Sequence, residues 1–321
     1  MYVGGNILKK LFILDLKPGN DIEDFFMIKS FALKTASNNK KYFDFTLGDK
    51  TGEINAKLWD AEENSDYKEG KIIKIKGSVS EWKGTNQIKI TKIRISTDED
   101  QCLLKDYIKV APEAPEEMYQ FILERAESID DDQLRQLTLE LLKKQETELL
   151  YYPAAMKNHH SILGGLLYHI KRMLMLAENM CLIYTNLRKD FLICGVILHD
   201  IAKIYEMQAD ECGIVSDYTY EGYLLGHIVQ GIKMVEKTGE TLGIDKEKLL
   251  MIEHMILSHH NEPEFGSPKR PMFPEAEMLH YLDQVDARIY DMEEALNNTK
   301  PGTFSDKIWT MHNRKLYKSK E

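Results

Sequence analysis

Cysteines are few in this sequence, and their spacing excludes two common uses of the residue. The chain has 321 residues with cysteine only at Cys102, Cys181, Cys194 and Cys212, and no two of these form a CxxC pair. A zinc ribbon or a disulfide framework needs closely spaced or paired cysteines. We therefore expect neither, and the cysteine content fits a protein of a reducing cytoplasm.

Long hydrophobic runs are also missing. The longest strongly apolar stretch, Phe191 to Leu198, is far shorter than the roughly 20 residues that span a bilayer. The N-terminus lacks the basic, apolar and small-residue succession of a secretory signal. Hydrophobic residues make up 43% and charged residues 29%, which is an ordinary globular balance. We expect a soluble cytoplasmic protein with no membrane segment, and the length suggests two domains.

Positive charge is in deficit overall, but unevenly so. The net charge is −10, yet residues 1–100 hold 17 Lys and Arg against 16 Asp and Glu, while the rest of the chain holds 25 against 36. The negative excess therefore lies in the second part. A locally basic surface in the first part could still bind phosphates.

The first part has the alternation of short strands. Apolar and polar residues alternate over residues 42–47, 54–59, 71–79 and 87–95, with turn residues at 48–52 and 83–86. The alternation slips between Ile90 and Ile93, which predicts a bulge near Thr91. Several short strands in under 100 residues predict a small closed β-barrel.

The second part has helical patterns. Residues 98–115 are charged and contain two prolines, which is typical of a linker. Pro115, with acids after it, predicts the start of a helix. Apolar residues then recur at helical spacing, as in the series Leu134, Leu137, Leu141 and Leu142, so residues 116–296 are expected to be almost wholly helical.

Nine of the ten histidines lie between residues 159 and 280, and one stands out. His199 and Asp200 directly follow the apolar run that ends at Leu198, where a polar side chain is costly unless it has a partner. A divalent cation is such a partner, since imidazole and carboxylate both bind Mn, Fe, Zn or Mg. On a continuous helix, Lys203 would face the same way as His199. Asp200 would be rotated by about 100° and could bridge to a second ion.

Further candidate ligands recur at intervals of about one helical hairpin: His169, His227, the pair His259 and His260, then Asp283 and Asp286. A single histidine is more often a hydrogen-bonded core or surface residue than a ligand. The ordered set is much harder to obtain by chance, and a helical bundle can bring such side chains to one centre. The sequence therefore predicts a metal site.

The same set resembles the HD-domain phosphohydrolase superfamily, all-helical hydrolases named for the dipeptide found here at His199-Asp200. The resemblance implies that one metal is bound by His169, His199, Asp200 and Asp283. Asp283 is preferred to Asp286 because residues 282–287 match the family's D-x-x-D-A stretch at its first aspartate. A second metal would be bound by His227, His259 and His260. Lys203 would contact the scissile phosphate.

A closer resemblance is to the YhaM family of bacterial 3′–5′ exoribonucleases. It is carried by Pro153-Ala154-Ala155, His159-His160, the stretch 164–169 and Leu257-Ser258-His259-His260, although family members often have Gly where this chain has Asn261. It implies a multi-domain α+β protein. A five-stranded OB-fold barrel (residues 1–97) and a linker (98–115) would precede an all-α HD-domain bundle (116–321).

The implied function is metal-dependent 3′–5′ degradation of single-stranded RNA, with single-stranded DNA left open, to nucleoside 5′-monophosphates. Metal-activated hydroxide would attack the terminal phosphodiester, with Asp200 and Lys203 as the catalytic residues. Manganese is the first choice for one or two ions, with Fe, Mg or Zn as alternatives. One rival is an HD-domain nucleotide or cyclic-dinucleotide phosphohydrolase. Another is a single-stranded DNA- or RNA-binding protein with incidental hydrolysis. Oligomeric state stays open.

An OB-fold would bind single-stranded nucleic acid, and the first part offers side chains for this. Exposed tryptophan beside lysine suits base stacking, and the candidates are Trp59, Lys74, Lys76, Trp82, Lys83 and Lys89. The alternative is that Trp59 caps the barrel core and the lysines are only solvated. For His159 and His160, a substrate channel and ordinary hydrogen bonding both stay open.

Overall fold

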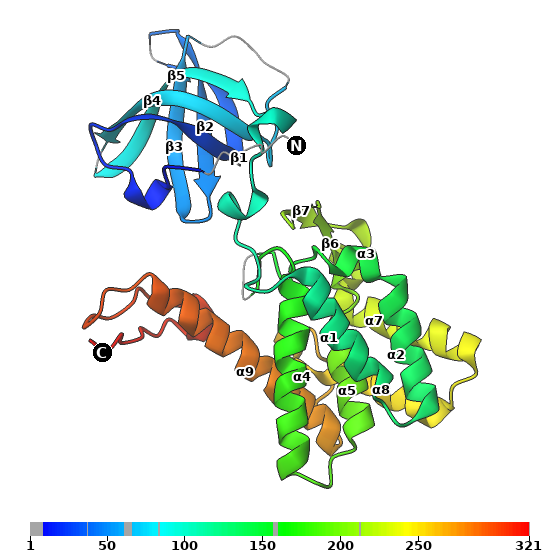
Figure 1. The fold of residues 1–321 in the computed structure, drawn as a ribbon. Helices are drawn as coiled ribbons and strands as arrows, with labels where there is room; N and C mark the ends of the chain where they lie inside the picture. The colour runs from blue at the N-terminus through cyan, green and yellow to red at the C-terminus, as the bar shows by residue number, and fades with distance from the viewer. Residues whose placement is uncertain are drawn as a thin grey trace, which may run out of the picture. The chain divides into compact units, whose positions relative to one another are not determined.

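The computed structural model describes residues 9–36, 38–60, 66–82, 84–156, 160–211 and 213–320. The chain divides into two compact units, and the boundary falls between Lys109 and Val110, inside the segment that the sequence suggests as a linker (Figure 1). The first unit is a β-barrel, and the second is mostly helical. The expected fold class is therefore confirmed.

The first unit is a closed barrel with the order β1-β2-β3-β5-β4. The strands are β1 (Asp21–Thr35), β2 (Lys41–Asp49), β3 (Gly52–Trp59), β4 (Ile72–Trp82) and β5 (Thr85–Ile95). Alternate side chains point inward, so apolar residues at every second position fill the core. Phe26, Phe45, Leu47, Ile73 and Ile88 are all fully buried there.

The predicted bulge in the last strand is confirmed. Lys76 pairs with Lys92 and Gly77 pairs with Ile90, which leaves Thr91 as the extra residue of β5. Its hydroxyl donates to the Lys76 carbonyl at 3.0 Å. The close approach explains why Gly77 is glycine, because a Cβ there would lie 2.3 Å from the Lys89 carbonyl oxygen.

Short 3₁₀ turns flank the barrel: η1 (Ile13–Asp15) precedes it, and η2 (Asp98–Asp100) and η3 (Leu104–Asp106) follow it. The Arg94 guanidinium on β5 donates two hydrogen bonds of 2.6 Å to the Asp100 carboxylate. Tyr107 is 2% exposed. Residues 98–107 therefore belong to the packed first unit.

The second unit surrounds a buried central helix. Its elements are α1 (Pro115–Glu127), α2 (Asp132–Lys144), α3 (Glu146–Leu149), α4 (Gly165–Ile183), α5 (Lys189–Leu198), α6 (Lys203–Glu206), β6 (Met207–Ala209), β7 (Val215–Tyr218), α7 (Tyr220–Leu242), α8 (Lys246–Ser258), η4 (Pro263–Phe265), α9 (Pro274–Asn297) and η5 (Trp309–Met311). Every residue of α5 from Phe191 to Leu198 is buried. Among the described residues, no helix is both long and apolar enough to cross a membrane.

Two details differ from the sequence prediction. The strands β6 and β7 form a small antiparallel sheet inside the region expected to be almost wholly helical. Strands of three and four residues are too short to show a period. In α7, Gly226 has φ +67°, so the helix is kinked one residue before His227.

Candidate metal centre

The His199-Asp200 pair lies in the turn after the buried helix α5. That helix ends at Leu198, and α6 begins only at Lys203. The prediction that His199 and Lys203 share one helix face is therefore wrong, because the helix is interrupted between them. The turn instead places the Lys203 ammonium 2.6 Å from Asp200 Oδ2. Both members of the pair are buried, with Asp200 2% exposed.

Five histidines converge, and in all of them Nδ1 is held by an oxygen atom of the protein. In each ring, Nδ1 lies 2.5–2.9 Å from an oxygen atom: Val196 O for His199, Ile256 O for His259, Phe265 O for His260, Glu206 Oε1 for His227 and Asp286 Oδ2 for His169. A carbonyl oxygen only accepts, so Nδ1 carries the proton in His199, His259 and His260. Their Nε2 lone pairs are therefore available to a ligand.

Asp200 stands at the centre of this convergence. Its Oδ2 lies 3.3 Å from His199 Nε2 and 3.9 Å from His169 Nε2. Its Oδ1 lies 3.3 Å from His227 Nε2 and 3.8 Å from His259 Nε2. The two oxygens of one carboxylate thus face two different histidine pairs.

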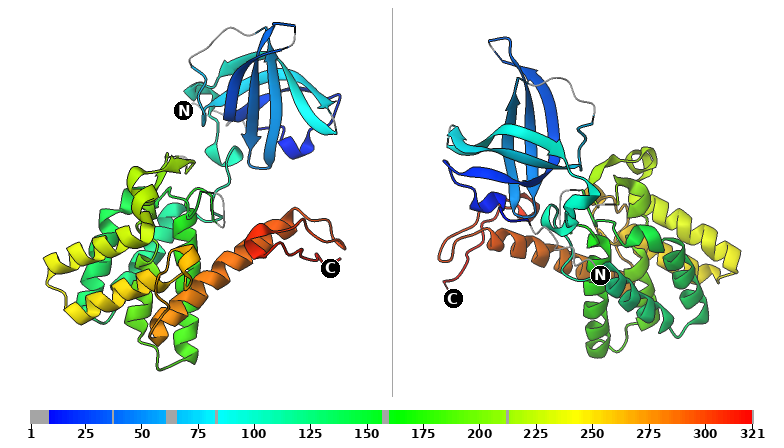
Figure 2. Two further views of the ribbon diagram at one scale, coloured as in Figure 1. Left: turned by 180° about the vertical axis from the view of Figure 1, so that it is seen from behind. Right: turned by 45° about the horizontal axis from the view of Figure 1, so that its top comes forward.

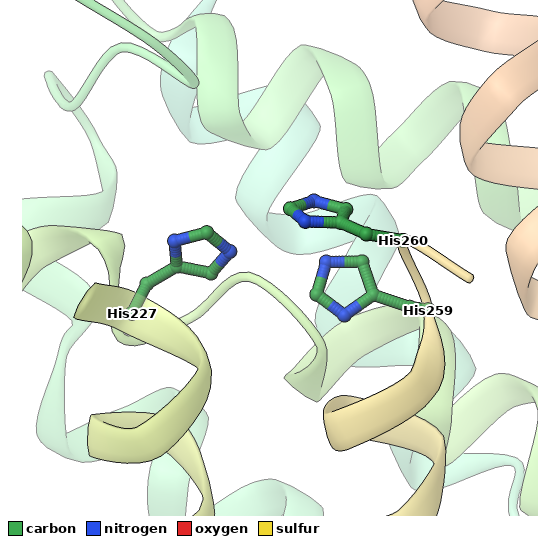
Figure 3. Close-up of side chains that lie close together, drawn as sticks. All are labelled: His227, His259 and His260. Atoms are coloured by element: carbon green, nitrogen blue, oxygen red, sulfur yellow. The ribbon is translucent and has the colours of Figure 1, made fainter. Parts of the chain in front are cut away.

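The remaining candidate ligands complete the two groups. Asp283, on α9, has its Oδ1 3.4 Å from His169 Nε2. His260 stands beside His259, with ring centroids 4.0 Å apart, and its ring centroid lies 5.5 Å from that of His227 (Figure 3). The structure therefore brings all seven predicted ligands to one centre: His169, His199, Asp200, His227, His259, His260 and Asp283.

A divalent metal fits these residues. Within the described part of the chain, Nε2 of His199, His227 and His259 and Oδ1 of Asp200 are buried without a hydrogen-bond partner. Leaving a buried polar atom unsatisfied costs about 1–3 kcal/mol each. A cation coordinated by these atoms removes that cost, and imidazole with carboxylate is a common donor set for divalent metals.

The charges at the centre suit a cation. Burial raises the pKa of Asp200, but Lys203 and His199 outweigh that effect and hold the pKa well below its usual value. Burial also lowers the pKa of His259 well below its usual value, which keeps that ring neutral as a ligand must be. For Lys203, the Asp200 charge outweighs burial and raises the pKa, so the ammonium stays protonated.

No positioning role was predicted from the sequence for the residues behind the ligands. The Asp286 carboxylate contacts the far side of a ligand ring, where its Oδ2 lies 2.7 Å from His169 Nδ1. The same oxygen lies 2.7 Å from His160 Nε2. Arg172 Nε donates to Asp286 Oδ1 at 2.5 Å. Glu206 takes the corresponding place beside His227. The only sequence signal was that each lies close to a ligand or, for Asp286, in the D-x-x-D-A stretch.

The loop after His259 and His260 begins with an unusual backbone conformation. Asn261 has φ +65°, in the left-handed region. Glycine adopts this conformation freely, and asparagine is the next most tolerant residue. Asn261 is therefore tolerated in the backbone conformation that this position requires.

The barrel candidates separate into different surroundings. The Trp59 side chain is 36% exposed and stacks on Tyr42, with ring centroids 4.7 Å apart. Lys57 Nζ lies 5.4 Å from the Tyr42 ring centroid, and Lys57 pairs across the strands with Lys89. Two aromatic rings and two cations thus share one outer surface of β2, β3 and β5.

The other described barrel candidates lie on β4, the strand next to β5. Lys74 and Lys76 on β4 lie 3.2 and 3.9 Å from the Glu23 carboxylate, so part of their charge is offset. Trp82, at the end of β4, is 66% exposed. Lys83 and His159 lie outside the described residues.

Two known families match the two units. The HD domain matches residues 166–288, and an OB-fold nucleic acid binding domain matches residues 28–96. The second match gives the barrel its fold name and supports binding of single-stranded nucleic acid. The first implies divalent-metal binding at the histidine–aspartate centre.

Similar proteins extend over nearly the whole chain. The 3′-5′ exoribonuclease YhaM of Geobacillus sp. (strain WCH70) is 40% identical over 95% of this chain and 94% of its own length. The 3′-5′ exoribonuclease YhaM of Halalkalibacterium halodurans is 40% identical over 95% of this chain and 95% of its own length. That of Bacillus subtilis (strain 168) is 38% identical over 94% of this chain and 95% of its own length. A solved domain of replication protein A from Methanococcus maripaludis is 24% identical over 26% of this chain and 92% of its own, with a TM-score of 0.24, too low to support any conclusion.

Proposed function

Because the chain belongs to the YhaM family of 3′–5′ exoribonucleases, we propose how its own residues carry out metal-dependent removal of nucleotides from the 3′ end of RNA. The proposal assigns ligands, a phosphate contact, a preferred metal and a substrate surface. The observation that carries it is the convergence of histidine Nε2 atoms on the two oxygens of Asp200.

The ligands form two groups that share Asp200. His169, His199, Asp283 and Asp200 Oδ2 make up the first group. His227, His259, His260 and Asp200 Oδ1 make up the second. A divalent metal held by these groups would polarise a phosphoryl oxygen and lower the pKa of bound water toward neutrality. A shared carboxylate fixes the spacing of the two groups, since both depend on one side chain.

Lys203 is assigned to the substrate phosphate. Its Nζ is held by Asp200 Oδ2 at 2.6 Å, and the ammonium has two further N–H groups. The ammonium can donate one of these to a non-bridging phosphate oxygen, where it offsets the negative charge that grows during attack. Lys203 is 8% exposed, so little water competes for that contact.

Manganese is the metal proposed first. The seven proposed donors are five imidazoles and two carboxylates, with no thiolate among them. Imidazole suits Fe and Zn, whereas carboxylate suits Mg and Mn. A set of both kinds accommodates all four ions, so manganese is the metal to test first, with Fe, Mg and Zn as the alternatives.

The barrel is assigned to single-stranded RNA. The surface of Tyr42, Lys57, Trp59 and Lys89 combines rings for base stacking with cations for the backbone. Trp82 offers a second exposed ring. Lys74 and Lys76 are proposed as phosphate contacts, although Glu23 offsets part of their positive charge. Lys83 is proposed as a contact from the sequence alone. Single-stranded DNA is the alternative substrate, since stacking does not distinguish the sugars.

The experiment compares the protein with its Asp200→Asn variant on 5′-labelled single-stranded RNA and DNA with manganese. The protein should shorten RNA from the 3′ end and release nucleoside 5′-monophosphates. The variant should lose at least about 1,000-fold in rate, because both ligand groups lose a charged donor. It should keep its RNA affinity. If the variant still degrades RNA, Asp200 is not a metal ligand of the active site. If the protein hydrolyses cyclic dinucleotides and does not degrade RNA, the proposal that RNA is the substrate is refuted.

A further inference from the structure

The chain continues past α9 into a hairpin that the proposed site does not use. Residues 298–320, here called the C-terminal hairpin, fold back on themselves, with the Ser305 N–H donating to the Leu316 carbonyl at 2.8 Å. Thr310 Oγ1 donates to Asp291 Oδ2 of α9 at 2.8 Å. Figures 1 and 2 show the hairpin beyond the end of α9, away from the other helices. It is an ordered extension rather than part of the helical core.

The charge of the C-terminal hairpin is opposite to that of the unit that carries it. Residues 110–297 hold 17 Lys and Arg against 33 Asp and Glu, a net charge of −16. The hairpin holds 6 against 1, a net charge of +5. Lys300, Lys307, Arg314, Lys315 and Lys320 are all exposed. A concentrated positive patch on an otherwise acidic unit favours a polyanionic ligand.

Exposed aromatic rings alternate with these cations. Phe304 is 64%, Trp309 70% and Tyr317 53% exposed. The Phe304 and Tyr317 rings lie side by side across the hairpin, with centroids 5.2 Å apart, and Trp309 lies in its turn. Interleaved rings and cations are the composition that binds unpaired bases and their phosphates. We propose that the C-terminal hairpin binds single-stranded RNA, as a second nucleic-acid contact separate from the barrel.

The distance along α9 between Asp283 and the C-terminal hairpin determines how long an RNA must be to contact both the metal centre and the hairpin. This step rests on the proposed function. Asp283 and Asn297 are both on α9, fourteen residues apart, which is about 21 Å at 1.5 Å per residue. At a stacked spacing of about 3.4 Å, that distance equals about 6 nucleotides. A strand whose 3′ end is at the metal centre therefore contacts the hairpin only when it is longer than this.

The first test measures binding without hydrolysis. The full chain with chelator is titrated into labelled single-stranded RNA of about 24 nucleotides, and anisotropy is followed at several salt concentrations. Trp309→Ala should weaken binding about five-fold or more, through loss of one stacked base. Arg314→Gln with Lys315→Gln should reduce the slope of log affinity against log salt by about 1.4, or about 0.7 per lost phosphate contact.

Lys233→Gln with Lys237→Gln is the matched control, since it also removes two exposed cations from the helical unit, on α7. This control should leave the affinity and the slope unchanged. Circular dichroism checks that every variant folds. If the hairpin variants bind the long RNA as the unaltered chain does, the proposal is refuted. A changed molecular mass in light scattering with unchanged RNA binding also refutes it, and would make the hairpin an interface between copies.

The second test uses substrate length, with manganese present. The hairpin variants should raise KM for RNA of about 24 nucleotides and leave hydrolysis of RNA of about 4 nucleotides unchanged. If the hairpin variants change the hydrolysis of both RNAs equally, the proposed minimum RNA length for contact with the hairpin is wrong. If the unaltered chain hydrolyses neither RNA, the proposed function has failed, and the binding test still decides the role of the hairpin.

Discussion

Asp286 Oδ2 lies 2.7 Å from His169 Nδ1, and this contact turns His169 Nε2 toward Asp283 and Asp200. Asp286 also accepts hydrogen bonds from Arg172 and His160, so its own position is fixed. A carboxylate behind a histidine ligand orients the ring and makes it a stronger donor. The second aspartate of the D-x-x-D-A stretch thus has a use other than ligation.

Replacing Asp286 by Asn should weaken metal binding about 10- to 100-fold. Three donors converge on this carboxylate, and an amide offers one oxygen in place of two, so His169 loses its fixed orientation. Isothermal titration of manganese into the metal-free chain measures the change. Arg288→Gln is the control, because Arg288 lies on the same helix, is exposed and donates to Gln284. Equal affinity for both variants would show that Asp286 does not position His169.

Glu206 should act on the second ligand group in the same way. Its Oε1 lies 2.9 Å from His227 Nδ1 and accepts the His227 backbone N–H at 3.0 Å. Glu206→Ala removes both contacts. They hold His227 directly after the kink at Gly226. The variant should weaken one of two manganese-binding events about 10- to 100-fold and leave the other unchanged. A titration identical to that of the unaltered chain, or equal loss of both events, contradicts this prediction.

Metal binding should release a proton near neutral pH. Burial lowers the pKa of His169, but the hydrogen bonds and charges of Asp283 and Asp286 outweigh it and raise the pKa to about 9 in the metal-free chain. A ligand must be neutral, so below pH 9 the metal displaces the proton, and affinity should rise about ten-fold per pH unit. Titration in two buffers of different ionisation enthalpy counts the proton. An affinity that stays constant between about pH 6.5 and 8.5 would refute this coupling.

Sequence periodicity predicted the elements whose pattern repeats. The barrel strands follow because inward and outward residues alternate, and even the bulge at Thr91 appears as a slip in that alternation. The His199-Asp200 pair was noticed because polar side chains after the apolar run of α5 need a partner, and the other ligands were implied by the family resemblance. The strands, the bulge and the pair are all marked by residues near one another in sequence.

The positioning role of Asp286 and the break between α5 and α6 were not predicted. Asp286 meets His160 and His169 across 126 and 117 residues, so no local pattern marks it as their partner. The turn that separates α5 from α6 was also missed, because Ile201 and Ala202 are buried like the helix before them. Burial without a change of period does not reveal where a helix ends.

Removal of the Trp59 ring should weaken binding of single-stranded RNA about five-fold or more, through loss of one stacked base. The Trp59→Ala variant is compared with Trp59→Phe, which keeps a ring on Tyr42 and should bind nearly as well. Anisotropy with chelator present measures both. Equal binding by the Ala variant would show that Trp59 only covers the barrel.

Asp100 should stabilise the barrel at neutral pH and not in acid. Hydrogen bonds from Arg94, together with the Thr97 N–H, outweigh burial and hold the Asp100 pKa well below its usual value. A carboxyl with a lowered folded pKa adds stability above its unfolded pKa, and this is lost as pH falls toward the folded value. Asp100→Asn should therefore cost about 2 kcal/mol of unfolding free energy at pH 7 and progressively less below about pH 3.9.

Urea unfolding measures this stability change. Trp309→Phe in every protein leaves Trp59 and Trp82 of the barrel as the fluorescent tryptophans. Asp60→Asn is the control, because its ion pair with Lys40 is exposed on both sides and contributes at most about 1 kcal/mol. A cost for Asp100→Asn that is the same at pH 7 and in acid would show that the stabilisation does not come from the ionised carboxylate. If Asp100→Asn lowers the unfolding free energy no more than Asp60→Asn does, the two hydrogen bonds from Arg94 to Asp100 stabilise the barrel no more than a surface ion pair.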